Sequence, residues 1–447
     1  MGYARWATEK EKAQISIPVN LNTYLEKTGI PFMYDKENLY LLKNNYHTLV
    51  IGSTGSGKTQ TIVLPTIKLS MKANESIVVS DPKGELYSRT AVQLEKEGYK
   101  VSVINLDNPN LGNGYNPLSF PYELYKNGNI DKAMEMLEDL GYYLLYDKKE
   151  KSSDPFWINS TIDYFTGLVL YLFDNAKEDE IHLLSVSSLA NELCEPEKCT
   201  KFMNNLERNS AIYINVAGTL KAPPETKGSI LAVFNQKIKK YISRENLCNM
   251  LLRTDFEFTK IGTEKSALFI IGGLNSFSDG LIPLIINQVY NIVDLYGNKE
   301  KSVNIILDEF DSLLPIKNFY KLITASRSIY IKFIVIVKGY RELINLYGPE
   351  DAEFLKQCFQ TIVYLISNDI TTLEEISSLC GKVEENKPLI DVEELKRLEI
   401  YEAIILTLRE MPIRTKLLPD YQIDYGYQIE YKELPERKKN TVKIYEF

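Results

Sequence analysis

Residues 48–59 read TLVIGSTGSGKT, and this order of residue types indicates the class of protein. An apolar run of strand length leads into the phosphate-loop pattern G-x-x-x-x-G-K-[ST], and a helix-like stretch follows it. Glycines let the backbone curl tightly enough to direct successive N–H groups at phosphate oxygens, and the start of the helix adds positive potential. In this strand-loop-helix context the pattern predicts that the chain binds a nucleoside triphosphate.

The pattern also assigns roles to single residues. Lys58 is expected to reach the β- and γ-phosphates and to be required for catalysis, and the Thr59 hydroxyl is expected to ligate Mg²⁺. The loop as a whole is expected to hold the phosphates of ATP, and its residues are Gly52, Ser53, Thr54, Gly55, Ser56, Gly57, Lys58 and Thr59.

A second motif lies far downstream, where the apolar run 303–307 ends in Asp308 and Glu309. Open parallel sheets place their ligands at the carboxyl ends of strands, so this is the Walker B arrangement. Asp308 is expected to hold Mg²⁺, and Glu309 is expected to orient and deprotonate the attacking water. The alternative is that Asp308 only caps the turn that follows the strand.

A third motif, Asp81-Pro82-Lys83-Gly84-Glu85, allows two interpretations. Pro82 and Gly84 suit a turn, Glu85 suits the first turn of a helix, and Asp81 suits a cap. The residues alone favour this structural interpretation. A functional one depends on a family resemblance.

Composition limits the class of protein without naming a partner. The chain has 447 residues, of which 44% are hydrophobic, so it can bury a large core over about two to four domains. Five cysteines without metal-ligand spacing and only two histidines argue against zinc and indicate reduced, cytosolic thiols. No apolar run reaches the roughly 18 residues that span a bilayer. A net charge of −8 leaves room for a local basic channel.

The order of apolar runs predicts a mostly parallel α/β sheet, because short β-rich runs alternate with helical stretches. The alternation stops between residues 121 and 253, where the spacing is helical, so this region is expected to be an inserted all-α domain. The expected strands are 48–51, 77–80, 100–104, 267–271, 303–307, 333–337, 362–366 and 403–406. The expected ranges are 1–120 and 254–435 for the two parts of the nucleotide-binding domain, 121–253 for the insert, and 436–447 for a flexible tail.

Together the motifs resemble those of the type IV coupling proteins of bacterial conjugation and type IV secretion. The matching stretches follow the order of that family over residues 4 to 415, and they are Ile51 to Thr59, Asp81-Pro82-Lys83-Gly84-Glu85, Tyr115-Asn116-Pro117-Leu118, Phe156-Trp157, Leu307-Asp308-Glu309-Phe310, and Lys321-Leu322-Ile323 with Ser326-Arg327-Ser328. Ala4-Arg5-Trp6-Ala7-Thr8 resembles the segment that follows the membrane helices of this family. The natural protein is therefore expected to be longer at its N-terminus.

The resemblance implies a RecA-like P-loop NTPase domain that is interrupted by the all-α domain. It implies a homo-hexameric ring at the cytoplasmic face of the bacterial membrane, although this portion can be a monomer by itself. The implied cofactors are ATP and Mg²⁺. The implied partners are a relaxase or relaxosome or secreted protein substrates, single-stranded DNA, and the ATPases and membrane subunits of a secretion channel.

For Arg327 and for the pair Phe156 and Trp157, the resemblance implies a functional role, and the residues alone also allow a purely structural one. Arg327 matches the position whose guanidinium completes the site of a neighbouring subunit, which would make it catalytic, but it can equally be a solvated surface cation. Phe156 and Trp157 can form a docking patch or can be core residues at a helix start.

One residue departs from the family pattern. After the apolar run 333–337 the family usually has a glutamine that senses the γ-phosphate, and this chain has Lys338. A lysine is a point charge without an acceptor, so hydrolysis can be slow or differently coupled to movement. Two further functions stay open: a nucleotide-gated docking hub with little ATPase activity, and another hexameric DNA translocase.

Overall fold

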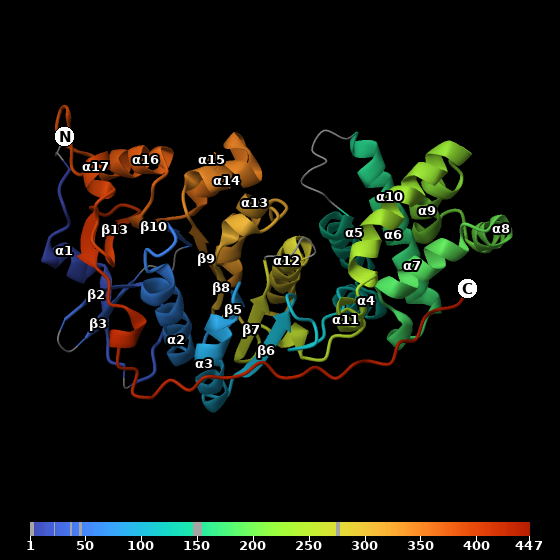
Figure 1. Cartoon of the computed structure of the whole chain (residues 1–447), viewed down its shortest axis with the longest axis horizontal. Coiled ribbons are helices and arrows are strands. Elements are labelled where there is room, and N and C mark those ends of the chain that lie inside the picture. The colour runs from blue at the N-terminus through green and yellow to red at the C-terminus, as the bar shows by residue number, and fades with distance from the viewer. Residues whose placement is uncertain (1–3, 22, 36–37, 44–46, 146–153, 274–277) are drawn as a thin grey trace. The chain divides into compact units, whose positions relative to one another are not determined.

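The computed structural model describes residues 4–21, 23–35, 38–43, 47–145, 154–273 and 278–447. They form two compact units (Figure 1). The sheet unit comprises Met1–Val103, Lys260–Ile271 and Tyr290–Glu433. The helical unit comprises Ile104–Thr259, Gly272–Val289 and Leu434–Phe447. No helix in the described ranges is both long and apolar enough to cross a membrane.

A nine-stranded sheet has the order β14-β13-β10-β4-β9-β8-β5-β7-β6. The ladders that join β10, β4, β9, β8, β5 and β7 are parallel, and β13 and β14 continue the sheet antiparallel. The strands are β4 Thr48–Gly52, β5 Ser76–Ser80, β6 Lys100–Asn105, β7 Ser266–Ile271, β8 Val303–Leu307, β9 Ile331–Val337, β10 Thr361–Ile366, β13 Glu402–Thr407 and β14 Ile413–Lys416. The expected strands are therefore confirmed, and β14 is an addition.

The inner strands are runs of Val, Ile and Leu because they are buried on both faces. Every residue of β4, β5, β7, β8 and β9 is buried, as expected for parallel strands covered by helices. The helices of the sheet unit are α1 Glu9–Gln14, α2 Leu64–Lys72, α3 Glu85–Lys96, α13 Phe319–Ser326, α14 Tyr340–Tyr347, α15 Pro349–Cys358, α16 Ile370–Cys380 and α17 Val392–Leu395. Smaller sheets pair β1 Ser16–Val19 and β2 Pro31–Tyr34 with β3 Leu39–Leu42, and β11 Lys382–Glu384 with β12 Lys387–Pro388.

The helical unit contains the predicted insert. Its helices are α4 Ser119–Lys126, α5 Ile130–Leu145, α6 Pro155–Asn175, α7 Leu183–Glu192, α8 Pro196–Asn205, α9 Ala211–Leu220, α10 Pro224–Ile242 and α11 Glu245–Met250, and α12 Ser278–Tyr296 begins in this unit. Gly167 lets α6 and α9 approach closely, because an added Cβ there would lie 2.5 Å from Cγ1 of Val216. The unit also includes Gly272–Val289, which the sequence-based ranges assigned to the nucleotide-binding domain.

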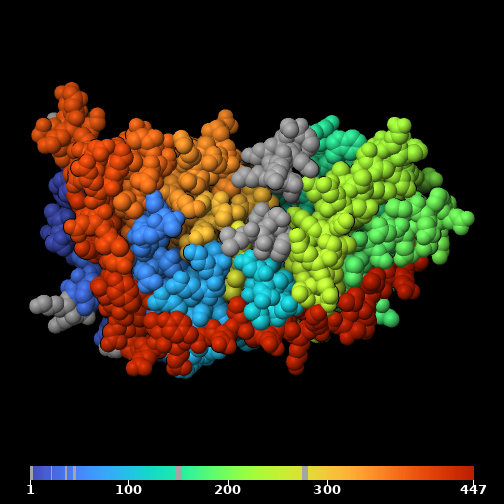
Figure 2. All heavy atoms as spheres, viewed as in Figure 1, coloured from blue at the N-terminus to red at the C-terminus, as the bar shows by residue number. Residues whose placement is uncertain are grey.

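The C-terminal segment differs from the flexible tail expected over residues 436–447. It runs extended over the surface of the helical unit (Figures 1 and 2). The amide of Arg437 donates to the Asn110 carbonyl over 2.8 Å, and Nε2 of His182 lies 2.9 Å from the Lys443 carbonyl. The ring of Phe447 packs edge-on against that of Phe202 at 5.8 Å. The charged composition of the tail gave no sign of these contacts, because their partners are distant in sequence.

Candidate nucleotide-binding site

The phosphate loop follows β4 and has the backbone geometry that its glycines predict. Gly55 and Gly57 have φ values of 81° and 91°, in the left-handed region that favours glycine. Gly52 is needed for a different reason, because an added Cβ would lie 2.4 Å from Oγ of Ser56. The Ser56 hydroxyl oxygen is itself buried without a hydrogen-bond partner among the described residues. A tightly curled loop therefore stands at the carboxyl end of β4.

A helix begins at Thr59, the last residue of the loop. Its first five residues, Thr59–Val63, are π-helical and lead into α2. Nζ of Lys58 folds back over the loop and donates to the carbonyl of Gly52 over 2.6 Å and to that of Ser53 over 2.9 Å. Burial lowers the pKa of Lys58, and the nearby carboxylate of Asp308 opposes that shift. The ammonium group thus lies within the loop and near the acidic residues of β8.

The two acidic residues end β8, at the same edge of the sheet as the loop, because β4, β9 and β8 are parallel neighbours. Asp308 is buried, and this burial raises its pKa. The amide of Glu309 donates to Oδ1 of Asp308 over 3.0 Å. Glu309 has φ 49°, which is uncommon outside glycine and is often found at functional sites.

The third motif contributes both a cap and a charge to this edge. Oδ2 of Asp81 accepts from the amide of Tyr87 over 2.9 Å, as the capping interpretation predicts for the start of α3. Asp81 also follows Ser80, which pairs with Leu307 across the β5–β8 ladder. Burial, with a smaller contribution from Asp308, raises the pKa of Asp81 to about 6. Two buried carboxyl groups with raised pKa values therefore lie close together here, as is common at functional sites.

Lys338 ends β9, between the loop strand and the acidic strand. Its ammonium group forms an ion pair with Oδ2 of Asp311 at 2.6 Å. Oδ1 of Asp311 is buried without a hydrogen-bond partner among the described residues. Sequence reasoning missed Asp311, although it follows Asp308 by three residues and could have been recognised as a further acid at this strand end.

Arg327 lies at the opposite end of the parallel strands, before the amino end of β9. It begins the short helical turn Arg327–Ile329, which precedes the first residue of β9, whereas the loop and acidic residues follow the last residues of their strands. A seven-residue strand is about 23 Å long at 3.3 Å per residue, so Arg327 does not join this site within one chain. The Arg327 side chain is exposed.

Phe156 and Trp157 open α6, in the helical unit. Phe156 is 48% exposed, which does not match the core alternative for this residue. Its ring packs edge-on against that of Trp157 at 5.2 Å. The pair thus presents an aromatic surface on the helical unit.

A phosphate loop after one strand of a parallel sheet, with an acidic pair after a nearby strand at the same edge, defines a P-loop NTPase. The family model described as "Type IV secretory system Conjugative DNA transfer" matches residues 5–386. The chain therefore belongs to the type IV secretory system conjugative DNA transfer family, as its motifs predicted. A search of curated proteins finds no match.

Solved structures of coupling proteins have the same fold. The unbound bacterial conjugative coupling protein TrwB superposes with a TM-score of 0.70 at 12% identity, covering 97% of this chain and 95% of that one. TrwB in complex with ADP and Mg²⁺ has a TM-score of 0.70 at 14% identity, and the match covers 98% of this chain and 97% of that one. VirB4 of Thermoanaerobacter pseudethanolicus has a TM-score of 0.51 at 13% identity, and the match covers 89% of this chain and 98% of that one. This similarity confirms the predicted fold, a RecA-like P-loop NTPase domain with an inserted all-α domain.

Proposed function

We propose that this protein binds and hydrolyses ATP with Mg²⁺ and thereby drives the recruitment and transfer of DNA or protein substrates to a type IV secretion channel. One observation carries the proposal: the curled loop after β4 and the acidic pair after β8 meet at one edge of the sheet, with Lys58 between them. Family membership supports the conjugative context.

The residues of this edge fit ATP and Mg²⁺. The loop is curled at Gly55 and Gly57, and its lysine is already directed inward. The hard carboxylate oxygen of Asp308 and the hydroxyl of Thr59 are ligands that Mg²⁺ prefers. TrwB has been solved with ADPNP and with ADP and Mg²⁺, which supports the same ligands for this chain.

Each side chain then has a task in phosphoryl transfer to water. Lys58 neutralises the charge of the β- and γ-phosphates, and Asp308 and Thr59 hold Mg²⁺, which supplies electrostatic stabilisation of the phosphates when bound. Glu309 accepts a proton from the attacking water and orients it. Asp81 and Asp308 are buried, so bulk water is largely excluded around their carboxyl groups. Charge interactions are stronger there than in water.

The assembled state that we propose is a homo-hexamer at the cytoplasmic face of the cell membrane. Arg327 lies at the sheet edge away from its own loop, which supports a role at the site of a neighbouring subunit. The exposed aromatic pair at the start of α6 supports substrate docking by the helical unit, to relaxase or secreted proteins. Single-stranded DNA and the other channel components complete the proposed partners.

A docking hub with little ATPase activity is the second candidate. The ion pair between Lys338 and Asp311 favours it, because Asp311 holds that lysine in the position where the family usually places a glutamine.

The test is steady-state ATPase activity with and without single-stranded DNA. Glu309→Gln should bind Mg²⁺-ATP as wild type does and lose hydrolysis by a factor of about 10² or more, since it keeps the size of the side chain and removes the base. Lys58→Ala should lose binding itself. Glu385→Gln, an exposed glutamate of the same unit, is the matched control and should change neither. Binding without measurable wild-type turnover would favour the hub, and turnover by Glu309→Gln would assign the base elsewhere.

A further inference from the structure

A tyrosine that the phosphate-loop motif does not include packs directly on the loop. A Cβ built on Gly57 would lie 2.7 Å from both Cδ1 and Cε1 of Tyr401. The ring of Tyr401 therefore covers the face of the loop at the residue just before Lys58.

The position of Tyr401 next to β13 shows on which side of the phosphate loop it lies. Tyr401 precedes β13, which pairs antiparallel with β10, so it lies at the carboxyl edge where β10 and β4 end. The acidic residues follow β8, which lies on the other side of β4, beyond β9. The outermost phosphate of a bound nucleotide must face those acids and Lys58. The sugar and base at the other end of the ligand then leave the loop toward β10 and β13, where Tyr401 stands.

A second tyrosine extends this surface. The hydroxyl oxygen of Tyr421 lies 3.4 Å from that of Tyr401, and the Tyr421 side chain is 59% exposed. Tyr421 belongs to the short helix Asp420–Gln422, which packs against the first turns after the loop. Two tyrosines therefore stand together beside the phosphate loop, Tyr401 partly exposed and Tyr421 largely exposed.

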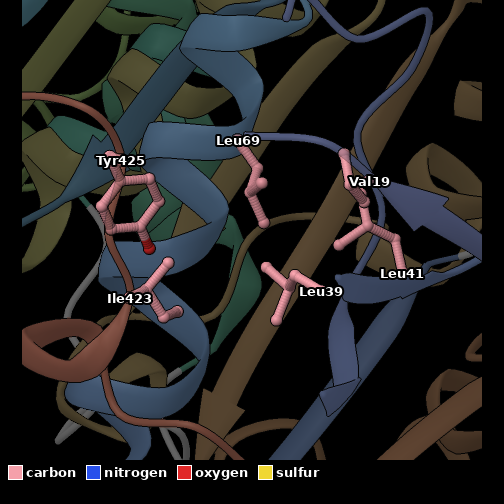
Figure 3. Close-up of a cluster of buried hydrophobic side chains, with 6 residues drawn as sticks. All are labelled: Val19, Leu39, Leu41, Leu69, Ile423 and Tyr425. Atoms are coloured by element: carbon pink, nitrogen blue, oxygen red, sulfur yellow. The ribbon is translucent and has the colours of Figure 1, made fainter. Parts of the chain in front are cut away.

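The segment that carries Tyr421 is held firmly on both sides. The buried carboxylate of Asp420 forms ion pairs with Lys68 of α2 at 2.8 Å and with Arg89 of α3 at 3.1 Å. After it, Ile423 and Tyr425 join a buried apolar cluster. Figure 3 shows these two side chains directed toward Leu69 of α2, with Val19, Leu39 and Leu41 completing the cluster. A segment anchored in this way can present an exposed ring in a fixed place.

The backbone of Tyr401 supports a functional reason for its position. Its φ is 67°, in the left-handed region, which is an outlier for a bulky residue and costs about 1 kcal/mol or more. The Tyr401 carbonyl accepts from the amide of Leu417 over 2.8 Å, which fixes this conformation. Glycine would relieve the strain, but it has no side chain to cover the loop.

We propose that Tyr401 and Tyr421 form the subsite for the nucleobase, in which the base stacks on their rings. The proposal rests on nucleotide binding by the phosphate loop and names the part of the site that recognises the base. Aromatic stacking accepts every base because every base has a π-face, and a purine overlaps more ring area than a pyrimidine. The subsite should therefore bind adenine and guanine nucleotides with similar affinity, and pyrimidine nucleotides more weakly.

The test compares two probes by calorimetry on the full chain: Mg²⁺ with ADPNP, and Mg²⁺ with inorganic tripolyphosphate, which has no base. Tyr401→Ala and Tyr421→Ala should each weaken ADPNP binding by about 5- to 150-fold, the range measured for loss of one stacking contact, and leave tripolyphosphate affinity unchanged. Tyr401→Phe and Tyr421→Phe should bind ADPNP as wild type does. Tyr24→Ala removes another exposed tyrosine of the same unit and should bind both probes normally.

The outcomes separate this proposal from nucleotide binding itself. If neither probe binds wild type, the phosphate-loop function fails. If wild type binds both and the alanine variants bind ADPNP equally well, the subsite is wrong. If they lose both probes to the same extent, the tyrosines only shape the loop, and the subsite is again wrong. The exposed Tyr421 keeps the test valid should Tyr401→Ala fail to fold.

Discussion

The lysine at the end of β9 changes the charge of the site in a way that a glutamine would not. Lys338 and Lys58 face three acidic side chains, those of Asp308, Glu309 and Asp311, and Asp311 already pairs with Lys338. The Asp311 carboxylate raises the pKa of Lys338, so the lysine stays charged at neutral pH. A second permanent cation thus stands beside the phosphate loop.

We expect Lys338→Gln to weaken binding of ADPNP by about tenfold and binding of ADP by much less. Removing one cation leaves Lys58 as the only lysine beside three carboxylates. The attraction between a lysine and a phosphate charge at roughly 6 Å contributes one to a few kcal/mol to the free energy of binding at this kind of site. Calorimetric titration of both nucleotides measures the difference. Asp311→Asn is the opposing variant and should tighten ADPNP binding, because it frees the lysine. Equal losses for ADP and ADPNP would show that Lys338 does not sense the third phosphate.

At the scale of elements, His47 joins two neighbouring strands of the sheet, β4 and β9. It directly precedes β4, and its Nδ1 accepts from the Phe333 amide of β9 over 3.0 Å. Its ring also stacks at a tilt of 44° against that of Phe333, with the ring centres 5.9 Å apart. Burial lowers the pKa of His47 to about 4, and the positive charge of Arg327 adds to this shift. A neutral imidazole therefore joins the start of β4 to β9.

This lowered pKa gives an element-scale prediction. An unfolded histidine titrates near pH 6.5, so between about pH 6.5 and 4 the unfolded chain binds a proton that the folded chain does not. The contribution of His47 to the free energy of unfolding is thus present above pH 6.5 and is lost as pH falls toward 4, by up to about 3 kcal/mol.

The measurement is urea unfolding of the sheet unit, followed by Trp6 fluorescence in a Trp157→Phe background. His47→Asn keeps an acceptor near the position of Nδ1 and does not titrate. The stability difference between parent and variant should stay constant from pH 8 to 6.5 and shrink as the pH is lowered to 4.5. A difference that is independent of pH over the whole range would contradict the prediction.

At the scale of the whole molecule, the two ends of the parallel strands carry complementary parts of one proposed site. The loop and Glu309 lie at the carboxyl edge, and Arg327 lies before β9 at the amino edge. A single chain cannot bring them together, but subunits that pack edge to edge in a ring can. A guanidinium supplied to a neighbour's phosphates is worth on the order of 10³ in rate.

We therefore expect mixing of two inactive variants to restore activity. Arg327→Ala should bind ATP as wild type does and lose ATPase activity where rings form, for example on single-stranded DNA. Mixed with Glu309→Gln, it should recover part of the turnover, because some interfaces then join an intact Glu309 to an intact Arg327. Arg208→Ala, an exposed arginine of the helical unit, should remain active alone. Full activity of Arg327→Ala, or no recovery on mixing, would show that Arg327 does not act between subunits.

The sequence by itself determined the features that depend on contiguous residues. The phosphate loop, the acidic pair after β8 and the expected strands are local patterns, in which spacing alone fixes backbone shape and burial. The helical insert could also be predicted, because apolar residues recur at helical spacing there and not in the alternation of short strands and helices found elsewhere. These patterns are enough to predict the class of protein and the phosphate end of the candidate site.

Only the tertiary structure decided which distant residues meet. The strand order β13-β10-β4-β9-β8 brings Lys338 to Asp311 and Tyr401 to Gly57, and the direction of β9 places Arg327 at the amino ends of the parallel strands. Residues 434–447 are part of the helical unit for the same kind of reason, because the residues they contact lie far back in the chain. Such contacts depend on how strands are ordered and how helices pack, and neither residue spacing nor composition records that order.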